Sequence, residues 1–446
     1  MNNDLKPKGN ILGILPLVIF LIIYMSMGIF TKSFDNMPLM VAILIASGIG
    51  LAFKKPGEKK PTTFSERVDM YCEGGGEKTL ILMVIIFMLA GAFYGVANKM
   101  HAVDSLTNIG LSILPANMIL PGLFIIACLL SFAMGTSMGT VAALTPIAIN
   151  IATKTGFGLP LVCGIVIGGA MFGDNLSFIS DTTIAATRTQ GVSMKAKFKA
   201  NIFMVLPAVV VNLIILAMQN APNLTLTAVY NYNIVNVIPY VLVIVLSLIG
   251  INVIFVMGIG VISGMVIGVI HGDFTFVGSF AVIHEGMTWM EDMSIIAILV
   301  GGMVAIMNYL GGIDWLLAKL TKRTKTARGG ELSIAALVSI MDIATTNNTI
   351  SIIATGPIAR DIADQFGIAR ERVASILDLF SSAFNGLLPY AGQMLVAGGL
   401  AKISPMSIMP YVWYCMLMIV FGTFFILIGW PKFIVKGKSK SVEGGL

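Results

Sequence analysis

Charged residues are scarce in this chain. Of its 446 residues only 11% are Asp, Glu, Lys or Arg, whereas 57% are hydrophobic. Soluble domains carry about 25% charged residues, so this composition excludes an ordinary soluble protein and favours a chain that crosses a membrane several times. The net charge of +6 comes from Lys and Arg gathered in short segments between apolar runs. That placement is typical of cytoplasmic loops and gives no reason to expect a nucleic-acid partner.

Cysteine and histidine are also rare, with four and three residues respectively. The cysteines show neither a disulfide framework nor metal-ligand spacing. A nucleotide-binding P-loop and a His-Glu-x-x-His motif are both absent, which argues against a nucleotide-driven pump and a metalloprotease. An intramembrane aspartyl protease would carry Gly-x-Gly-Asp, but Met171-Phe172-Gly173-Asp174 stands in its place. We therefore expect neither enzymatic activity nor an organic cofactor.

Long hydrophobic runs predict an all-α polytopic membrane protein with about ten membrane-spanning helices. The first run, 11–30, is too long for a signal peptide and is predicted to be an uncleaved anchor. Two segments, 119–153 and 331–359, are too long for one crossing and have polar residues midway, which indicates re-entrant hairpins. Two further segments, 159–187 and 373–401, are predicted to be broken helices.

The interruptions repeat along the chain. Thr145-Pro146-Ile147-Ala148 returns 211 residues later as Gly356-Pro357-Ile358-Ala359, and the same shift places Thr136-Ser137 on Asn347-Asn348. When the basic loops are taken as cytoplasmic, the first hairpin opens outward and the second inward. The sequence therefore predicts an inverted repeat with paired broken helices, which in secondary transporters form the binding site.

This topology divides the chain into five parts, with both termini in the cytoplasm. The predicted parts are an N-terminal transmembrane hairpin and cytoplasmic loop at 1–78, a first inverted repeat at 79–219, linking spans that act as scaffold at 220–289, a second inverted repeat at 290–430 and a cytoplasmic tail at 431–446.

Four carboxylates fall inside predicted membrane segments: Asp174, Asp181, Asp342 and Asp378. An acid at the bilayer centre costs about 2.5–3.5 kcal/mol on insertion scales, so each is a candidate for function. The alternative for the acids of the second half is a hydrogen-bonded contact between helices.

Oxygen-bearing side chains surround Asp174 in the sequence. Asn175, Ser177, Asp181 and Thr182 offer oxygen ligands that suit a hard cation such as Na⁺. A structural alternative is that these hydroxyls bond to their own helix and that Asp174 only caps the next helical segment.

In the second half, Asp342 precedes the polar cluster 345–349, and Asp378, Ser382 and Asn385 share one helix face. The hairpin tips could meet at the midplane, or their polar residues could only turn the chain. The predicted ion- or substrate-binding residues are Asp174, Asn175, Ser177, Asp181, Thr182, Thr136, Ser137, Asp342, Thr346, Asn347, Asn348, Thr349, Asp378, Ser382 and Asn385, with Asp174, Ser137, Asn348 and Asn385 as Na⁺ ligands.

The segment from Gly173-Asp174-Asn175 to Ser180-Asp181-Thr182-Thr183 resembles the NhaC family of Na⁺/H⁺ antiporters. Phe178 stands where that family usually has proline. The resemblance implies Na⁺ and H⁺ exchange, with Asp174 and Asp181 as ion carriers. The hairpin motifs are similar in kind to those of the wider ion-transporter superfamily, which includes Na⁺/dicarboxylate transporters. That likeness implies a homodimer with a static scaffold and an elevator-like moving domain.

The sequence thus predicts a Na⁺/H⁺ antiporter of a bacterial plasma membrane, with the lipid bilayer, Na⁺ and H⁺ as its partners. The alternative is a Na⁺-coupled transporter or exchanger of a small amino acid or carboxylate, whose carboxylate the N–H groups of 136–139 and 347–349 would hold. Because the basic residues are assigned to loops and tails, no buried Lys or Arg is expected, which favours a bare cation as cargo.

Overall fold

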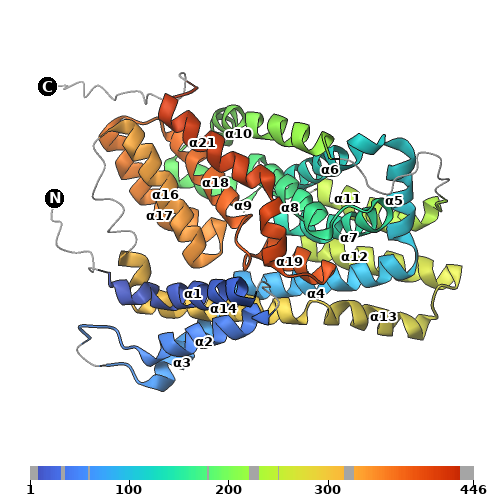
Figure 1. Cartoon of the computed structure of the whole chain (residues 1–446), viewed down its shortest axis with the longest axis horizontal. Coiled ribbons are helices and arrows are strands. Elements are labelled where there is room, and N and C mark those ends of the chain that lie inside the picture. The colour runs from blue at the N-terminus through green and yellow to red at the C-terminus, as the bar shows by residue number, and fades with distance from the viewer. Residues whose placement is uncertain are drawn as a thin grey trace.

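The computed structural model describes residues 9–31, 36–58, 61–177, 180–219, 231–249, 251–315 and 326–431. Within these residues the chain is helical and forms no β-strand, which confirms the all-α prediction (Figure 1). Apart from Pro431, the predicted cytoplasmic tail lies outside the described residues.

The first half of the chain, up to the 220–230 connection, contains ten α-helices and two short 3₁₀ helices among its described residues. They are η1 (Ile11–Ile14), α1 (Leu15–Thr31), α2 (Leu39–Ala52), α3 (Phe64–Gly75), α4 (Lys78–Lys99), α5 (Ala102–Ile113), η3 (Ala116–Met118), α6 (Ile119–Met134), α7 (Ser137–Thr155), α8 (Leu159–Leu176), α9 (Asp181–Gln190) and α10 (Met194–Ala217).

The second half follows with a similar series. Its described elements are η4 (Ile234–Val237), α11 (Ile238–Leu248), α12 (Val253–His271), α13 (Phe276–Thr288), α14 (Glu291–Tyr309), α16 (Ala327–Thr345), α17 (Asn348–Phe366), α18 (Arg370–Asn385), α19 (Gly392–Ala401), α20 (Pro405–Ile408), η6 (Met409–Tyr411) and α21 (Trp413–Ile428).

Several helices are long and apolar enough to cross a membrane. Within the described residues, five helices have the length and composition of a membrane span. A sixth span is added if the bent pair Pro405–Tyr411 and Trp413–Ile428 is counted as one. The five are Leu80–Lys99, Leu159–Gln190, Met194–Ala217, Val253–His271 and Glu291–Tyr309, and shorter apolar helices such as Leu39–Ala52 accompany them. The chain is therefore a polytopic membrane protein, and the total of about ten spans stays a prediction.

Two helical hairpins enter the molecule from opposite ends. Hairpin 1 consists of α6 and α7, and hairpin 2 consists of α16 and α17, which lie at the left of Figure 1. Adding 211 to the bounds of α7 gives 348 and 366, the bounds of α17, and the same shift carries α9 onto α19. Each hairpin also holds a proline inside its second helix, Pro146 or Pro357. The repeated sequence pattern therefore corresponds to a repeated fold.

Residues 64–75 form a helix in a segment that the sequence analysis assigned to a loop. Thr63 caps α3 through a capping box with Glu66, a local signal for a helix start. A Cβ atom at Gly74 would lie 2.8 Å from the carbonyl oxygen of Gly301, so this glycine lets α3 pack closely against α14. Arg67 is buried and donates from Nε to the carbonyl oxygen of Leu51. Basic residues here therefore do more than orient the chain.

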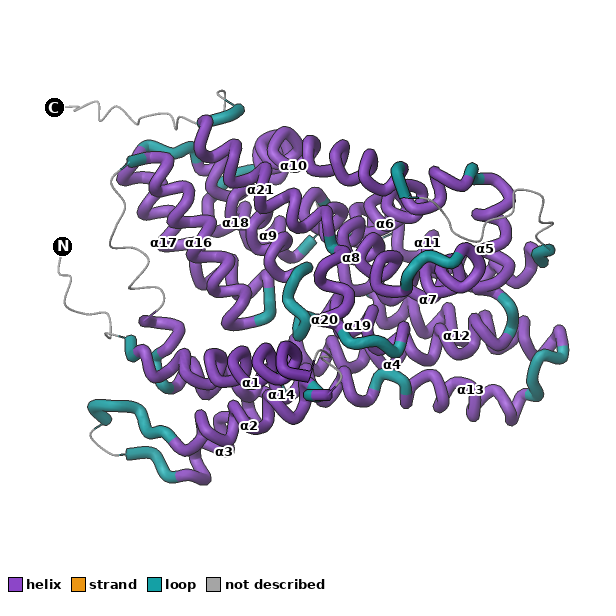
Figure 2. Tube along the Cα trace, viewed as in Figure 1, coloured by secondary structure: helices purple, strands orange, loops and turns teal. Residues whose placement is uncertain are grey.

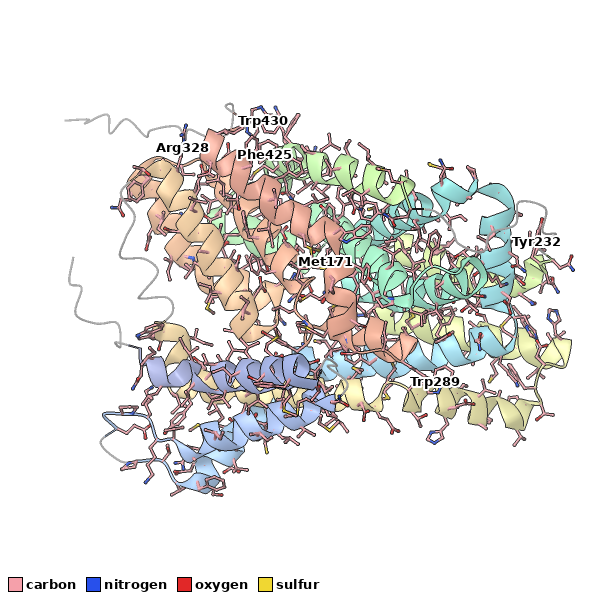
Figure 3. The ribbon with its side chains drawn as sticks, viewed as in Figure 1. Met171, Tyr232, Trp289, Arg328, Phe425 and Trp430 are labelled. Carbon is pink, nitrogen blue, oxygen red and sulfur yellow. The ribbon has the colours of Figure 1, made fainter. Side chains whose placement is uncertain are left out.

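Gly173 sets the distance between α8 and hairpin 1. A Cβ atom at this position would lie 2.4 Å from the backbone nitrogen of Phe132 and 2.5 Å from the carbonyl oxygen of Cys128. Only a residue without a side chain permits this contact. Met171, two residues earlier, lies near the middle of the molecule (Figure 3). The close packing therefore places the next residue, Asp174, beside the hairpin tip.

A buried ion pair joins α16 to α18. Arg372 is 0% exposed and donates from Nη2 to Oε2 of Glu331 at 2.9 Å, while its Nη1 donates to the carbonyl oxygen of Trp430 at 2.6 Å. Trp430 and Phe425 lie together at one end of the molecule (Figure 3). The sequence analysis assigned the basic residues to loops and tails, but Arg372 lies on α18 and is enclosed by the end of α21.

Candidate ion-binding site

Both hairpin tips and both helix breaks meet at one cavity of about 270 Å³, here called the central cavity. Figure 2 shows the loop segments that interrupt the helices near the middle of the molecule. Gly135–Met138 of hairpin 1 and Thr346–Thr349 of hairpin 2 line it, together with residues at the α8–α9 and α18–α19 breaks. Eight helix ends thus approach one small space, and irregular backbone of this kind in a membrane protein lines a cavity or is buried in protein.

Asp174 lies in the wall of this cavity and is held in place by two hydroxyl groups. Ser137 Oγ donates to Oδ2 at 2.9 Å, and Ser180 Oγ donates to Oδ1 at 2.6 Å. Gln393 Nε2 in turn donates to Ser137 Oγ at 2.9 Å. The cap of α9 is Ser180, whose hydroxyl accepts from the backbone N–H of Thr182, so Asp174 is not the capping residue. The carboxylate is oriented toward the cavity.

Three amide side chains at the cavity have buried polar atoms without partners among the described residues. They are Asn348 Nδ2, Asn385 Nδ2 and Gln393 Oε1. Buried polar groups are almost always hydrogen-bonded, so such a gathering indicates a place for a ligand or ordered water. A half-turn of an amide exchanges its oxygen and nitrogen, which lets Asn348 and Asn385 present an oxygen to a cation.

The charge around the central cavity is negative. The described residues that line it include two carboxylates, Asp174 and Asp181, and no Lys, Arg or His. A monovalent cation would be attracted here, and hydroxyl, amide and carboxylate oxygens are ligands that hard cations prefer.

Comparison with known proteins agrees with this geometry. The sequence profile of the Na⁺/H⁺ antiporter family matches residues 10–218 and 191–430. The chain belongs to the Na⁺/H⁺ antiporter family. It is therefore a secondary active transporter of the membrane, in a family of antiporters, and the resemblance to NhaC proteins is confirmed.

Curated relatives differ in the cargo that their names state. The chain is 24% identical over 392 residues to the malate-2H⁺/Na⁺-lactate antiporter of Bacillus subtilis, covering 81% of this chain and 83% of the relative. It is 23% identical over 417 residues to the Na⁺/H⁺ antiporter NhaC of Alkalihalophilus pseudofirmus, covering 86% and 87%. Among solved structures, MtrF of Neisseria gonorrhoeae aligns with a TM-score of 0.40 at 15% identity over 95% of this chain and 96% of that one.

In this antiporter, ten of the fifteen predicted site residues line the central cavity. They are Thr136, Ser137, Asp174, Asp181, Thr182, Thr346, Asn347, Asn348, Thr349 and Asn385. The other five are buried outside the lining: Asn175, Ser177, Asp342, Asp378 and Ser382. The cavity also includes Ser180, Gln393 and Asn252, which were not among the predicted site residues.

A second polar cluster lies behind the break between α8 and α9. Lys197 Nζ pairs with Asp378 Oδ2, donates to the carbonyl oxygen of Asn175 and donates to Thr183 Oγ1 at 3.0 Å. The side chains of Lys197 and Asp378 are 1% and 0% exposed. Ser382 Oγ donates to Asp378 Oδ1 at 3.3 Å. Asp378 is thus already neutralised by an internal ammonium group.

Lys197 corrects the expectation that no buried basic residue would be found. The sequence analysis assigned the basic residues to loops and tails, but α10 begins at Met194 and carries Lys197 into the core. Its helical positions give the missing signal, because the buried residues Lys197, Asn201, Met204, Val205 and Ala208 fall at i, i+4, i+7, i+8 and i+11 on one helix face. A basic residue on the buried face of an apolar helix indicates an internal ion partner.

Asp342 does not reach the central cavity. It is 0% exposed on α16, and neither of its carboxyl oxygens has a hydrogen-bond partner among the described residues. Its backbone carbonyl oxygen accepts the N–H of Thr346 at 2.7 Å, which ties Asp342 to the tip of hairpin 2.

Proposed function

We propose that this antiporter exchanges Na⁺ for H⁺, with Na⁺ bound in the central cavity. The observation that carries the proposal is Asp174, a carboxylate held by two hydroxyls in a cavity whose described lining has no basic residue. A buried carboxylate without a cationic partner is strongly unfavourable, so it attracts a cation.

The proposed Na⁺ ligands are Asp174, Ser137, Asn348 and Asn385. Ser137 already contacts Asp174, and the unpartnered amides of Asn348 and Asn385 complete the lining from the second half. Na⁺ and H⁺ compete for the single negative charge of Asp174, and this competition couples the two ions. Asp181 adds a second negative charge to the wall of the cavity. Of the remaining lining residues in the predicted set, Thr136, Thr346, Asn347 and Thr349 form the hairpin tips, and Thr182 lies in the first turn of α9.

The proposal includes the cellular arrangement expected from the sequence. The protein lies in a bacterial plasma membrane with both termini in the cytoplasm, and the parts 79–219 and 290–430 carry the site while the linking spans 220–289 contribute scaffold. A homodimer with elevator-like movement completes this arrangement. Accessibility of single cysteines at the termini to an impermeant reagent tests the orientation, and mass measurement in detergent tests the dimer.

Transport in proteoliposomes tests the ion exchange directly. Purified protein is reconstituted with a pH-sensitive dye inside, and Na⁺ is added outside without any organic solute. We expect Na⁺ entry to be accompanied by loss of internal protons and a rise of internal pH. Protein-free vesicles and addition of K⁺ in place of Na⁺ are the controls. No change of pH with Na⁺ alone would overturn the proposal.

A second candidate function is exchange of a small carboxylate together with Na⁺. The first residues of α7, α9, α17 and α19 all line the central cavity, namely Ser137, Asp181, Asn348 and Gly392. Helix N-termini bind anions through free N–H groups, and one relative is named a malate-2H⁺/Na⁺-lactate antiporter. The amino-terminal helix ends thus favour an anion at the place where the carboxylates favour a cation.

Thermal stability of the purified protein separates the two candidates. A ligand at 100 times its Kd stabilises the native state by about 2.7 kcal/mol, which raises the unfolding temperature. Na⁺ exchange alone predicts stabilisation by Na⁺ or Li⁺ and none by malate, lactate or amino acids. Stabilisation by an organic acid that requires Na⁺ would favour the second candidate.

A further inference from the structure

The buried charges of the described residues do not balance. Four acidic side chains are less than 9% exposed: Asp174, Glu331, Asp342 and Asp378. Glu331 pairs with Arg372 and Asp378 pairs with Lys197, while Asp174 faces the central cavity. Asp342 is left without a cationic partner among these residues. An unpaired buried carboxylate has to bind a cation or a proton.

The surroundings of Asp342 are hydroxyl groups and one like charge. Ser351 on α17 and Ser381 on α18 lie beside its carboxyl group, and Asp378, whose charge is paired with Lys197, is also near. Ser381 Oγ is itself buried without a partner among the described residues. Asp342 lines neither the central cavity nor the other cavity that borders hairpin 2. A proton, unlike Na⁺, needs no cavity and would turn the carboxyl group into a hydrogen-bond donor toward these hydroxyls.

Two hydrogen-bonded hydroxyls, those of Ser351 and Thr345, lead from the neighbourhood of Asp342 to that other cavity, here called the side cavity. Ser351 Oγ lies 2.7 Å from Thr345 Oγ1, either of which can donate. Thr345 lines the side cavity of about 590 Å³ together with Asn347, and Glu73 and Glu77 stand in its wall. A hydroxyl both donates and accepts a hydrogen bond, so two in series can pass a proton without a change of position.

We propose that Asp342 binds a second proton in the exchange, in addition to the proton that competes with Na⁺ at Asp174, and that protons reach Asp342 from the side cavity through Thr345 and Ser351. A proton from water binds the Thr345 hydroxyl, the proton of Thr345 passes to Ser351, and the proton of Ser351 passes to the Asp342 carboxylate. One proton is transferred in total and the carboxylate becomes a neutral acid. This second proton reaches Asp342 without entering the central cavity, where Na⁺ binds. This inference rests on the proposed Na⁺/H⁺ exchange.

The first half of the chain shows that the fold does not need an acid at this position. Asp342 and Ser381 correspond to Ser131 and Ala170 after the shift of 211 residues. There, Ser131 Oγ donates to the carbonyl oxygen of Ala170 at 2.5 Å, and no charge is involved. A neutral hydrogen bond is therefore sufficient to join the hairpin to the broken helix.

The principal test is Asp342→Asn, which has the shape of a neutral acid and cannot release a proton. We expect the variant to fold, to keep an unfolding temperature near that of the wild type and to keep its stabilisation by Na⁺. The number of protons moved per Na⁺, measured from the reversal potential of proteoliposomes, should fall. An unchanged ratio would overturn this inference, whereas absence of Na⁺-driven proton flux in the wild type would overturn the proposed function instead.

The hydroxyl chain is tested with Thr345→Val and Ser351→Ala. A positioned proton-transfer group contributes on the order of 10²-fold or more to a rate, so proton flux should slow by at least that factor while Na⁺ stabilisation is kept. Thr355→Val is the control on the same hairpin, because its hydroxyl is also buried but donates only to the backbone oxygens of Ser351 and Ile352. Equal rates for Thr355→Val and Thr345→Val would overturn the route.

Infrared spectroscopy gives a readout that does not depend on transport. Wild-type protein at neutral pH should show a carboxylic-acid band that Asp342→Asn removes and Asp378→Asn retains. A wild type without a band that depends on Asp342 would overturn the assignment of the proton.

Discussion

The tips of the two hairpins turn the chain in the same way with different residues. Gly135 ends α6 with φ 65°, and Thr346, 211 positions later, ends α16 with φ 56°. Thr136 and Asn347 then cap the next helices by accepting N–H bonds from Gly139 and Ile350, which also correspond. The backbone is repeated closely, although a left-handed conformation is easy for glycine and strained for a β-branched residue.

The carboxylates of the two halves are not repeated. Asp174 on α8 corresponds to Asn385 on α18, and Asp342 on α16 corresponds to Ser131 on α6. Lys197 on α10 corresponds to Ile408. The comparison teaches that the inverted repeat supplies two similar frames, whereas the charges that would bind ions are placed once each. The following variants test this difference.

Asp174→Asn gives the first half the asparagine that the second half has at the corresponding position, Asn385. Of all the variants, it should have the largest effect on transport. We expect Na⁺-dependent proton flux and Na⁺ stabilisation to be lost, because the hydroxyls of Ser137 and Ser180 would surround a neutral amide. Correct folding is checked by gel filtration, since Asn preserves the shape of the side chain. Adding Asn385→Asp returns a carboxylate from the other half and should restore Na⁺ binding. Normal flux in the single variant would remove Asp174 from the mechanism.

Lys197→Ile replaces the lysine with the residue type of its repeat partner and leaves Asp378 unpaired in the core. Breaking a buried ion pair on one side costs about 3–5 kcal/mol, so we expect a large fall in the unfolding temperature. The double variant Lys197→Ile/Asp378→Ile removes both charges. Isoleucine is chosen for position 378 because the corresponding residue of the first half, at position 167, is isoleucine. We expect this variant to recover most of the lost unfolding temperature. A double variant no more stable than the single one would contradict this account.

Gly135→Thr gives hairpin 1 the tip residue of hairpin 2. A left-handed conformation costs a residue with a side chain about 1–2 kcal/mol, so the unfolding temperature should fall modestly. The reverse change, Thr346→Gly, should raise the unfolding temperature by a smaller amount, because glycine loses about 0.5–1 kcal/mol more conformational entropy on folding. Equal and opposite shifts for the two variants would argue against this reading of the tips.

Asn348→Ala should have the smallest effect, since a neutral amide is one of several ligands. A typical hydrogen bond contributes about 0.5–1.5 kcal/mol, which corresponds to a Na⁺ affinity several-fold weaker with flux retained. Titration of the thermal shift with Na⁺ measures this change. Asn348→Ser, which copies Ser137 of the first half, keeps an oxygen and should lie between wild type and the alanine variant. Complete loss of flux in Asn348→Ala would mean that Asn348 does more than ligate.

Features that depend on neighbouring residues were predictable. The hairpins and helix breaks were visible because polar residues such as Asp174 and Asn347–Thr349 interrupt apolar runs that are otherwise uniform. The repeat was visible because its period is constant. Helix α3 was missed although Thr63 and Glu66 form a local capping signal, since its basic residues were interpreted only as a marker of orientation.

The partners of buried charges were not predictable in the same way. Lys197 and Arg372 lie near basic loops in the sequence, and only the packing of α10 and α18 against distant helices encloses them. The separation of Asp342 from the central cavity likewise follows from how hairpin 2 lies against α18, a contact between segments far apart in the chain.

The sequence by itself determined the all-α membrane architecture, the inverted repeat and the polar interruptions, because hydrophobic length and local helix-breaking residues act over a few turns of chain. The tertiary structure decided which oxygens surround Asp174, which acids are already neutralised and which acid is left alone. Those outcomes depend on distances between helices, and the Coulomb and desolvation energies that make a carboxylate bind a cation exist only once the helices are packed.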